Sequence, residues 1–246
     1  MTMAVAAQGA RPNLERRFYM AMVLAVIASI VLGFSRSFFL RPLFPGVHAP
    51  HEIYFYLHGA VFTCWLLLIL VQASLVTAGN TARHMQFGVI GFALVPLMVV
   101  VGVIGSLIAA RRPGGFTDIP VPPLQFLVVP VYDIALFAIL AGAGLLLRRD
   151  RQSHKRLMLI ATIAIAEAGV ARWPFEPYAS NPDAAVWTIC LFLIPLAIWD
   201  AYSQRRIHPA TLAGAVLLLT EGPLRNWLMQ TGAWMAFARW STGLLG

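Results

Sequence analysis

Residues 153–174 read SHKRLMLIATIAIAEAGVARWP, an apolar segment with His154 at its start, Glu167 inside it and Arg172 near its end. A helix rises ~1.5 Å per residue, so a segment of this length matches the ~30 Å hydrocarbon core of a bilayer. The pattern therefore predicts a membrane-spanning helix. A carboxylate inside such a helix is energetically costly, which makes Glu167 a candidate functional residue.

A later segment repeats this plan. His208 and Pro209 open an apolar run, Glu221 lies inside it, and Arg225 lies near its end. The interval from His154 to Glu167 equals that from His208 to Glu221, 13 residues. Both glutamates should therefore lie at similar depth in the membrane.

The composition supports a helical membrane protein. Of the 246 residues, 59% are hydrophobic and 11% are charged, whereas soluble domains carry about 25% charged residues. The apolar runs are long enough to cross a bilayer as helices. The net charge of +8 does not indicate nucleic acid as a partner, because the basic residues lie in short loops where they set topology and meet lipid head groups.

We expect an all-α bundle of seven transmembrane helices in one domain, 1–246, with a cytoplasmic segment at 1–17 and an amphipathic tail at 230–246. Internal prolines at positions 96, 130 and 195 predict kinks, and Gly222-Pro223 could break the last helix. The predicted helices are Phe18–Leu40, Glu52–Ala78, Thr81–Ala110, Pro123–Leu147, Lys155–Trp173, Asp183–Asp200 and Pro209–Met229.

The basic residues predict the orientation. One side of this topology carries 11 Lys and Arg residues and the other carries 7, so the N-terminus is expected in the cytoplasm. Seven is high for an outer face, so some of these arginines should have another role. After the first helix the chain forms three hairpins with a histidine at each inner turn, which suggests an internal repeat; alternatively, basic residues and histidines simply collect at that interface.

Depth along the helices predicts an outer polar pocket. His58 should lie roughly 9 Å below the outer surface, Asp133 roughly 15 Å, and both glutamates roughly 12 Å. Two interpretations remain: a site for a ligand, proton or metal, or a structural cluster that pairs Glu221 with Arg225 and Glu167 with Arg172. The pocket and its rim comprise His58, Asp133, Glu167, Glu221, Arg36, Arg172 and Arg225.

A second candidate site lies at the inner side. His84, His154 and His208 each begin an outward-running helix. Three imidazoles can bind a transition metal and two can ligate haem b, although histidines at a membrane interface can also be merely solvated. Retinal is excluded as a cofactor, because the lysine that its Schiff base needs is missing from the last helix; Lys155 is the single lysine of the chain.

Several motifs resemble a known group of proteins. The run from His58 to Trp65 (HGAVFTCW), the run from His154 to Thr162 (HKRLMLIAT) and Arg206-Ile-His208-Pro209 resemble motifs of small uncharacterised bacterial multi-pass membrane proteins. The resemblance covers roughly residues 50–215 and implies a bacterial inner-membrane location. The HKRLM run is also loosely similar to histidine-bearing membrane proteins of haem–copper oxidase assembly, which implies a respiratory context but transfers no catalytic residue.

Three functions are compatible with these observations. The first is a membrane protein that binds haem or a metal through His84, His154 and His208, or that assists assembly of a respiratory complex. The second is a proton-coupled transporter or binding protein for a small solute, anionic or protonatable, that uses the buried carboxylates. The third is a structural subunit of a membrane complex. No motif supplies an enzymatic nucleophile.

Overall fold

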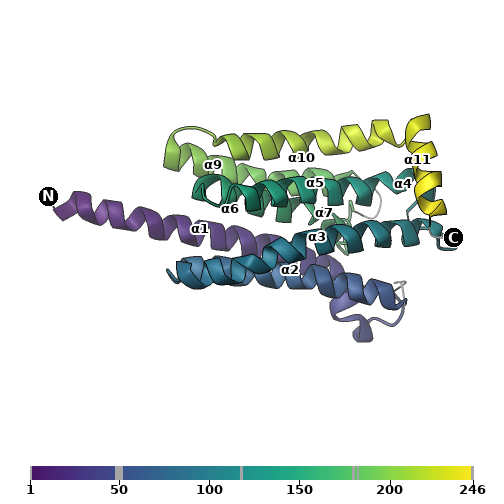
Figure 1. Cartoon of the computed structure of the whole chain (residues 1–246), viewed down its shortest axis with the longest axis horizontal. Helices are drawn as coiled ribbons and strands as arrows, with labels where there is room; N and C mark the ends of the chain where they lie inside the picture. Colours follow the sequence, from purple (N-terminus) through teal and green to yellow (C-terminus); the bar gives the residue numbers. More distant parts are fainter. Residues whose placement is uncertain (1, 48–51, 117–118, 179–180, 182, 245–246) are drawn as a thin grey trace.

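The computed structural model describes residues 2–47, 52–116, 119–178, 181 and 183–244, and regular secondary structure in these residues is helical throughout. The long helices lie side by side along one axis, and α11 crosses one end (Figure 1). The helices are α1 (Thr2–Phe34), α2 (Ile53–Thr77), α3 (Thr81–Arg111), α4 (Pro123–Phe126), α5 (Val128–Leu146), α6 (Arg151–Ala164), α7 (Glu167–Val170), α8 (Ala184–Leu191), α9 (Leu193–Gln204), α10 (Pro209–Leu228) and α11 (Gly232–Gly243), with a π-helical turn η1 (Ser35–Phe39) and a 3-10 turn η2 (Arg41–Leu43).

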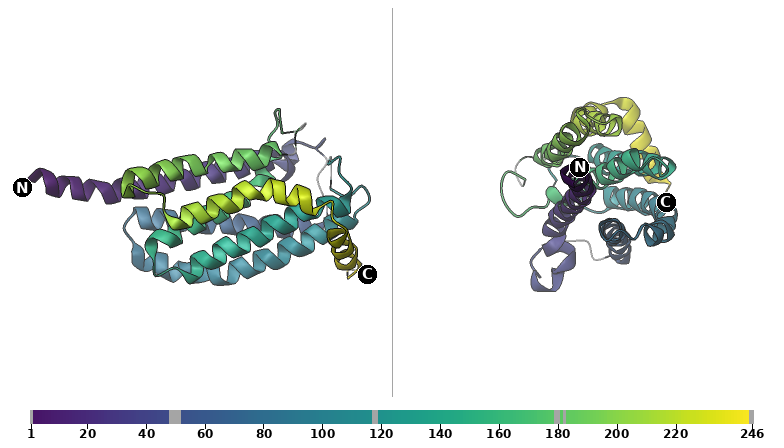
Figure 2. Two further views of the ribbon diagram at one scale, coloured as in Figure 1. Left: turned by 90° about the horizontal axis from the view of Figure 1, so that it is seen from above. Right: turned by 90° about the vertical axis from the view of Figure 1, so that its left-hand side faces the viewer.

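The two ends of the bundle differ in their helix termini. We call the end where α3, α6 and α10 begin the inner end, and the end that α11 covers the outer end (Figures 1 and 2). One continuous apolar core runs between them and takes side chains from α1, α2, α3 and α5 to α10. The largest fully buried side chain of this core is Trp65, whose ring packs edge to face against that of Phe137.

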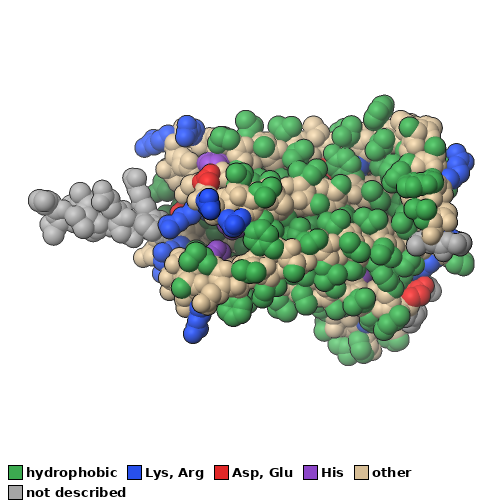
Figure 3. Space-filling view, viewed as in Figure 1, with side chains coloured by type: hydrophobic (Ala, Val, Ile, Leu, Met, Phe, Trp, Pro, Cys, Tyr) green, Lys and Arg blue, Asp and Glu red, His purple; other side chains and the backbone are tan. Residues whose placement is uncertain are grey.

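The surface is that of a membrane protein. Five segments are long and apolar enough to cross a bilayer: Asn13–Phe39, Ile53–Thr77, Thr81–Arg111, Pro123–Leu146 and Ala184–Gln204. Hydrophobic side chains cover the middle of the bundle, and Lys and Arg gather at its ends, mostly the inner one (Figure 3). Since lipid solvates apolar side chains and water solvates the charged ones, the coarse prediction of a multi-pass helical membrane protein is confirmed.

Several predicted helix bounds change. The first helix begins at Thr2 and not at Phe18, although its apolar span begins at Asn13. The predicted helices at 123–147, 155–173 and 183–200 are each interrupted. Residues 230–244 form a further turn and α11, which packs on α3 and α4; residues 1, 245 and 246 of the predicted end segments lie outside the described residues.

Two of the interruptions follow from proline. A proline has no N–H to donate to the carbonyl four residues before it. The helix α4 ends at Phe126, four residues before Pro130, and α8 ends at Leu191, four residues before Pro195. In contrast, α10 continues through Pro223, so the possible break at Gly222-Pro223 does not occur.

The third interruption separates α6 from α7 without a proline. At this point α7 meets α1 backbone to backbone: a Cβ added to Gly33 would lie 1.8 Å from the Gly169 carbonyl oxygen, and one added to Gly169 would lie 2.8 Å from Ile30 Cα. Small residues permit such close helix crossings in membranes. The Trp173 Nε1 donates to the Ser29 carbonyl at 3.0 Å and fixes the same contact.

This crossing generates a stability prediction. Gly33→Ala forces α1 away from α7, since backbone atoms cannot rotate out of the way as a side chain can. Overpacking of this kind costs about 1–3 kcal/mol or more, so the apparent melting temperature should fall by about 5 °C or more in detergent. Thermal unfolding followed by circular dichroism measures the change.

Gly142→Ala on α5 is the matched control, because an added Cβ there meets nothing within 4 Å. Alanine also favours the helix by about 1 kcal/mol, so this variant should melt at or above the wild-type temperature. Equal melting of Gly33→Ala and wild type would contradict the proposed contact.

Candidate functional site in the outer half of the bundle

Arg225, in the last turn of α10, lies at the centre of three buried carboxylates. Its Nη1 donates to Asp133 Oδ1 at 2.6 Å and to Glu167 Oε2 at 2.9 Å, and its Nη2 donates to Glu167 Oε1 at 2.8 Å. A longer contact of 3.3 Å joins Nη1 to Glu221 Oε1. We call these four residues the carboxylate cluster. The side chains come from α5, α7 and α10, so the cluster ties three helices together.

Local sequence directs each of these side chains inward. Glu221 and Arg225 are four residues apart and share one face of α10, as predicted from their spacing. Two glycines bring this face close to its neighbours: a Cβ on Gly214 would lie 2.6 Å from Ile160 of α6, and one on Gly222 would lie 3.3 Å from Val186 of α8. Asp133 lies on the buried face of α5.

The cluster is nearly closed to solvent. Exposed side-chain fractions are 4% for Arg225, 0% for Glu221, 6% for Glu167 and 11% for Asp133. A buried ionised group needs both a partner of opposite charge and hydrogen bonds to offset its desolvation. One guanidinium cannot supply both for three carboxylates.

Glu221 shows directly that the cluster has too few hydrogen-bond donors for its carboxylates. Its Oε2 is buried and has no hydrogen-bond partner among the described residues. One carboxylate oxygen from each of Asp133, Glu167 and Glu221 lies within 4.8 Å of the other two. With all three acids ionised, the cluster would carry two negative charges in excess, which only protons or a cation can neutralise.

The other predicted members of the outer pocket lie elsewhere. Arg172 donates from Nη1 to the Ala168 carbonyl at 2.5 Å and lies over the Phe34 ring, so Glu167 pairs with Arg225 instead. Arg36 lies over the ring of Phe44.

His58 packs against α3 and stays outside the cluster. Its ring stacks on Phe62 at 4.3 Å between centroids, and its buried Nδ1 has no hydrogen-bond partner among the described residues. The Nδ1 would lie 3.3 Å from a Cβ added to Gly105 of α3. His58 therefore occupies a tight apolar position between α2 and α3.

The three inner histidines separate into a pair and a helix cap. The rings of His84 and His154 lie 6.3 Å apart, and His154 Nδ1 is 2.7 Å from the Gly144 carbonyl oxygen. His208 caps α10, because its Nδ1 accepts from Ala210 N at 3.1 Å. Burial, reinforced by the nearby positive charge of Arg156, lowers the pKa of His208, which favours the neutral ring that this cap needs.

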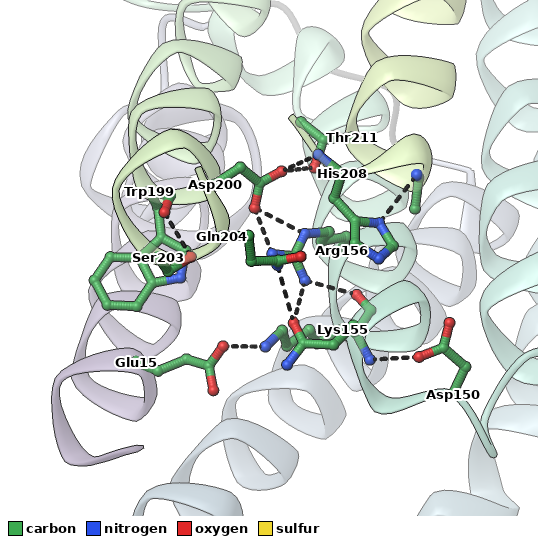
Figure 4. Close-up of polar contacts among 12 residues, drawn as sticks. Glu15, Asp150, Lys155, Arg156, Trp199, Asp200, Ser203, Gln204, His208 and Thr211 are labelled. Atoms are coloured by element: carbon green, nitrogen blue, oxygen red, sulfur yellow. Dashed lines mark hydrogen bonds and ion pairs between the residues drawn. The ribbon is translucent and has the colours of Figure 1, made fainter. Parts of the chain in front are cut away.

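The structure also contains an inner ion pair that the sequence analysis missed (Figure 4). Arg156 of α6 binds Asp200 of α9 through both Nε and Nη2, and both side chains are fully buried. Asp200 accepts further bonds from Thr211 Oγ1 at 2.6 Å and from the backbone N of His208 at 3.0 Å. Arg156 is one of the basic residues on the predicted inner side, where such residues usually set the topology. Asp200, an acid at the end of an apolar run, is the feature of the sequence that indicates a buried partner for it.

The inner and outer clusters differ in how fully they are paired. Around Arg156 and Asp200 there is one cation for one anion, and Arg156 Nη1 also donates to Gln152. Because the charges of Arg156 and Asp200 balance each other and both side chains are hydrogen-bonded, a structural role accounts for this pair. The carboxylate cluster has two more acids than cations. In the described chain it is the group of three or more potential metal-binding side chains whose ligand atoms lie within 4.8 Å of one another.

Several outer arginines hold the outer loops in place. Arg41 Nη1 donates to the Tyr56 hydroxyl at 2.7 Å, Arg111 Nη1 donates to the Thr242 carbonyl at 3.1 Å, and Arg112 Nη2 donates to the Gly115 carbonyl at 3.1 Å. These bonds give a structural reason for the high count of basic residues on the predicted outer face.

Comparison of the chain with protein-family models, curated proteins and solved structures finds no match. The function is therefore inferred from the geometry of the described residues.

The unequal charges predict opposite effects for two substitutions in one cluster. Arg225→Gln leaves three buried acids without their cation, and breaking a buried pair in this way costs about 3–5 kcal/mol. Glu221→Gln removes an uncompensated acid at nearly constant volume, so it should leave the melting temperature unchanged or raised. Thermal unfolding of both purified variants measures the difference; equal destabilisation by the two would show that Glu221 is a fully paired structural group.

Proposed function

We propose that this chain is a membrane transporter or binding protein for a small solute, and that it takes up positive charge at the carboxylate cluster. In this proposal α6–α7 and α10 cross the membrane together with the five long apolar segments, giving seven passes with the N-terminus inside and three hairpins after α1. The excess of carboxylates over cations favours a proton or a cationic solute over an anion.

One observation carries this proposal. The buried Glu221 Oε2 has no hydrogen-bond partner in the described part of the chain, although the adjacent guanidinium of Arg225 contacts all three acids. A purely structural cluster would not need the third acid, since Arg156 and Asp200 form a saturated pair in the same bundle. An acid with one unpartnered oxygen in the apolar interior is instead suited to accept a proton or ligate a cation.

The helix interruptions give the cluster a means of changing shape. Glu167 is the first residue of α7, directly after the break that follows α6. Discontinuous helices of this kind form binding sites near the midplane of many transporters. Neutralising Glu167 would weaken its two bonds to Arg225, which releases α7 from α10 and lets the short helix reorient.

The proposal predicts a protonated carboxylic acid inside the protein when no other cation is bound. Infrared difference spectroscopy of the purified protein should detect its carbonyl stretch, which disappears in Glu221→Gln. In proteoliposomes with an internal pH dye, a cation from a panel of small solutes should collapse an imposed pH gradient, and Glu167→Gln should lose this response while it remains folded. Asp150→Asn is the control, since Asp150 lies outside the cluster and Asn also caps a helix.

A carboxylic-acid band that persists in both glutamine variants, or wild-type flux through Glu167→Gln, would contradict the proposal.

The inner histidine pair supports a second candidate function, haem b or transition-metal binding with a role in assembly of a respiratory or other membrane complex. Nδ1 of His154 is held by the Gly144 carbonyl. With the Gln72 amide oriented so that its oxygen accepts from Gly88 N, its nitrogen lies 2.5 Å from His84 Nδ1. His154 therefore has Nε2 left for a metal, with Nδ1 held by a neighbour as in many metal sites. In His84 the Nδ1 accepts from Gln72, so the neutral ring carries its proton on Nε2, and His84 would bind a metal through Nδ1 in place of the Gln72 nitrogen.

This second candidate predicts a Soret band or a stoichiometric transition metal in the purified protein. The signal should be lost in His84→Ala and in His154→Ala. His208→Asn should retain it if the pair alone is the site, because asparagine can replace the cap on α10. Absence of both the band and bound metal, measured by optical spectroscopy and elemental analysis, would overturn this candidate.

A further inference from the structure

We infer that the carboxylate cluster binds a divalent cation of the hard, oxygen-preferring class, represented by Mn²⁺, Mg²⁺ or Ca²⁺. This inference rests on the site of the proposed function and specifies the class of its ligand. The cation enters between Asp133 and Glu221 while Arg225 remains bound to Glu167.

The donor set determines the class of ion. Asp133, Glu167 and Glu221 offer carboxylate oxygens, and among the described residues no sulfur or imidazole belongs to this group of ligand atoms within 4.8 Å of one another. Oxygen ligands of this kind select magnesium, calcium and manganese over soft or imidazole-preferring metals.

The spacing fits such an ion. One ligand atom from each acid lies within 4.8 Å of the other two. Ligands on opposite sides of a cation lie about 4.2 Å apart for Mg²⁺ and about 4.6–5.2 Å apart for Ca²⁺, from their usual bond lengths. The spacing between Asp133 and Glu221 therefore suits an ion held between them, once Arg225 Nη1 withdraws from these two acids and keeps its bonds to Glu167.

The hydrogen bonds indicate which oxygens are available. Arg225 forks onto both oxygens of Glu167, but it contacts Asp133 through Oδ1 and Glu221 through Oε1. Glu221 Oε2, which is buried and lacks a partner among the described residues, is the open position.

The charge fits a divalent ion better than a monovalent one. Three carboxylates and one guanidinium leave two negative charges. One divalent cation removes this excess, which matters because uncompensated charge in the membrane interior is costly. Arg225 then acts as a permanent fourth partner that keeps the acids together when the ion is absent.

The test uses Mn²⁺ and the full-length protein in detergent. Electron paramagnetic resonance and elemental analysis after gel filtration should give about one Mn²⁺ per chain. Glu221→Gln should weaken binding by at least about tenfold, as loss of a metal-supporting group commonly does, and Asp150→Asn should bind as wild type.

Metal rescue provides an independent readout. Mn²⁺ should raise the melting temperature of Arg225→Gln more than that of wild type, because the ion replaces the missing positive charge; it should not raise that of the double variant with Glu221→Gln.

Unchanged affinity in Glu221→Gln, or no binding of Mn²⁺, Mg²⁺ or Ca²⁺ to the wild type, overturns the inference. In that case, a carboxylic-acid infrared band that depends on Glu221 would leave the proposed function standing with the proton as its cation. Loss of both the binding and the band would overturn both proposals.

Discussion

The desolvation of charge controls the interior of this bundle. A carboxylate or a guanidinium away from water needs a counter-charge and hydrogen bonds, and the chain meets this need at two levels. At the inner end Arg156 and Asp200 satisfy each other with help from Thr211. In the outer half Arg225 holds three acids that outnumber it. The same physical constraint is therefore fully met by the inner ion pair and only partly met in the carboxylate cluster.

The position of the site depends on backbone proximity more than on side-chain packing. The glycines of α10 let it approach α6 and α8, and Gly169 lets α7 touch α1. At each contact a glycine takes the place of a larger residue, so the two helix backbones can approach closely. In a membrane, where no hydrophobic effect drives helices together, such close van der Waals packing stabilises their association. As a result three acids from separate helices reach a single guanidinium.

The sequence predicted the class of multi-pass helical membrane protein, and it grouped Asp133, Glu167 and Glu221, which do lie together. It also predicted the pairing of Glu221 with Arg225, because a spacing of four residues fixes a shared helix face. It did not predict the rotation of each helix about its axis. Arg172 is at a suitable depth but points to Phe34, and Asp200 looked like a helix end although it is buried. Such rotations depend on long-range contacts.

The helix α1 bridges the break between α6 and α7. Near the inner end its Glu15 pairs with Lys155 of α6, and near the outer end its Gly33 lies against Gly169 of α7. The continuous helix α1 thus contacts both parts of the interrupted segment, α6 before the break and α7 after it. Because this contact joins backbone to backbone, a movement of α7 away from Arg225 would also displace α1. The first helix thereby sets the stiffness of the buried site, although it contributes no polar group to it.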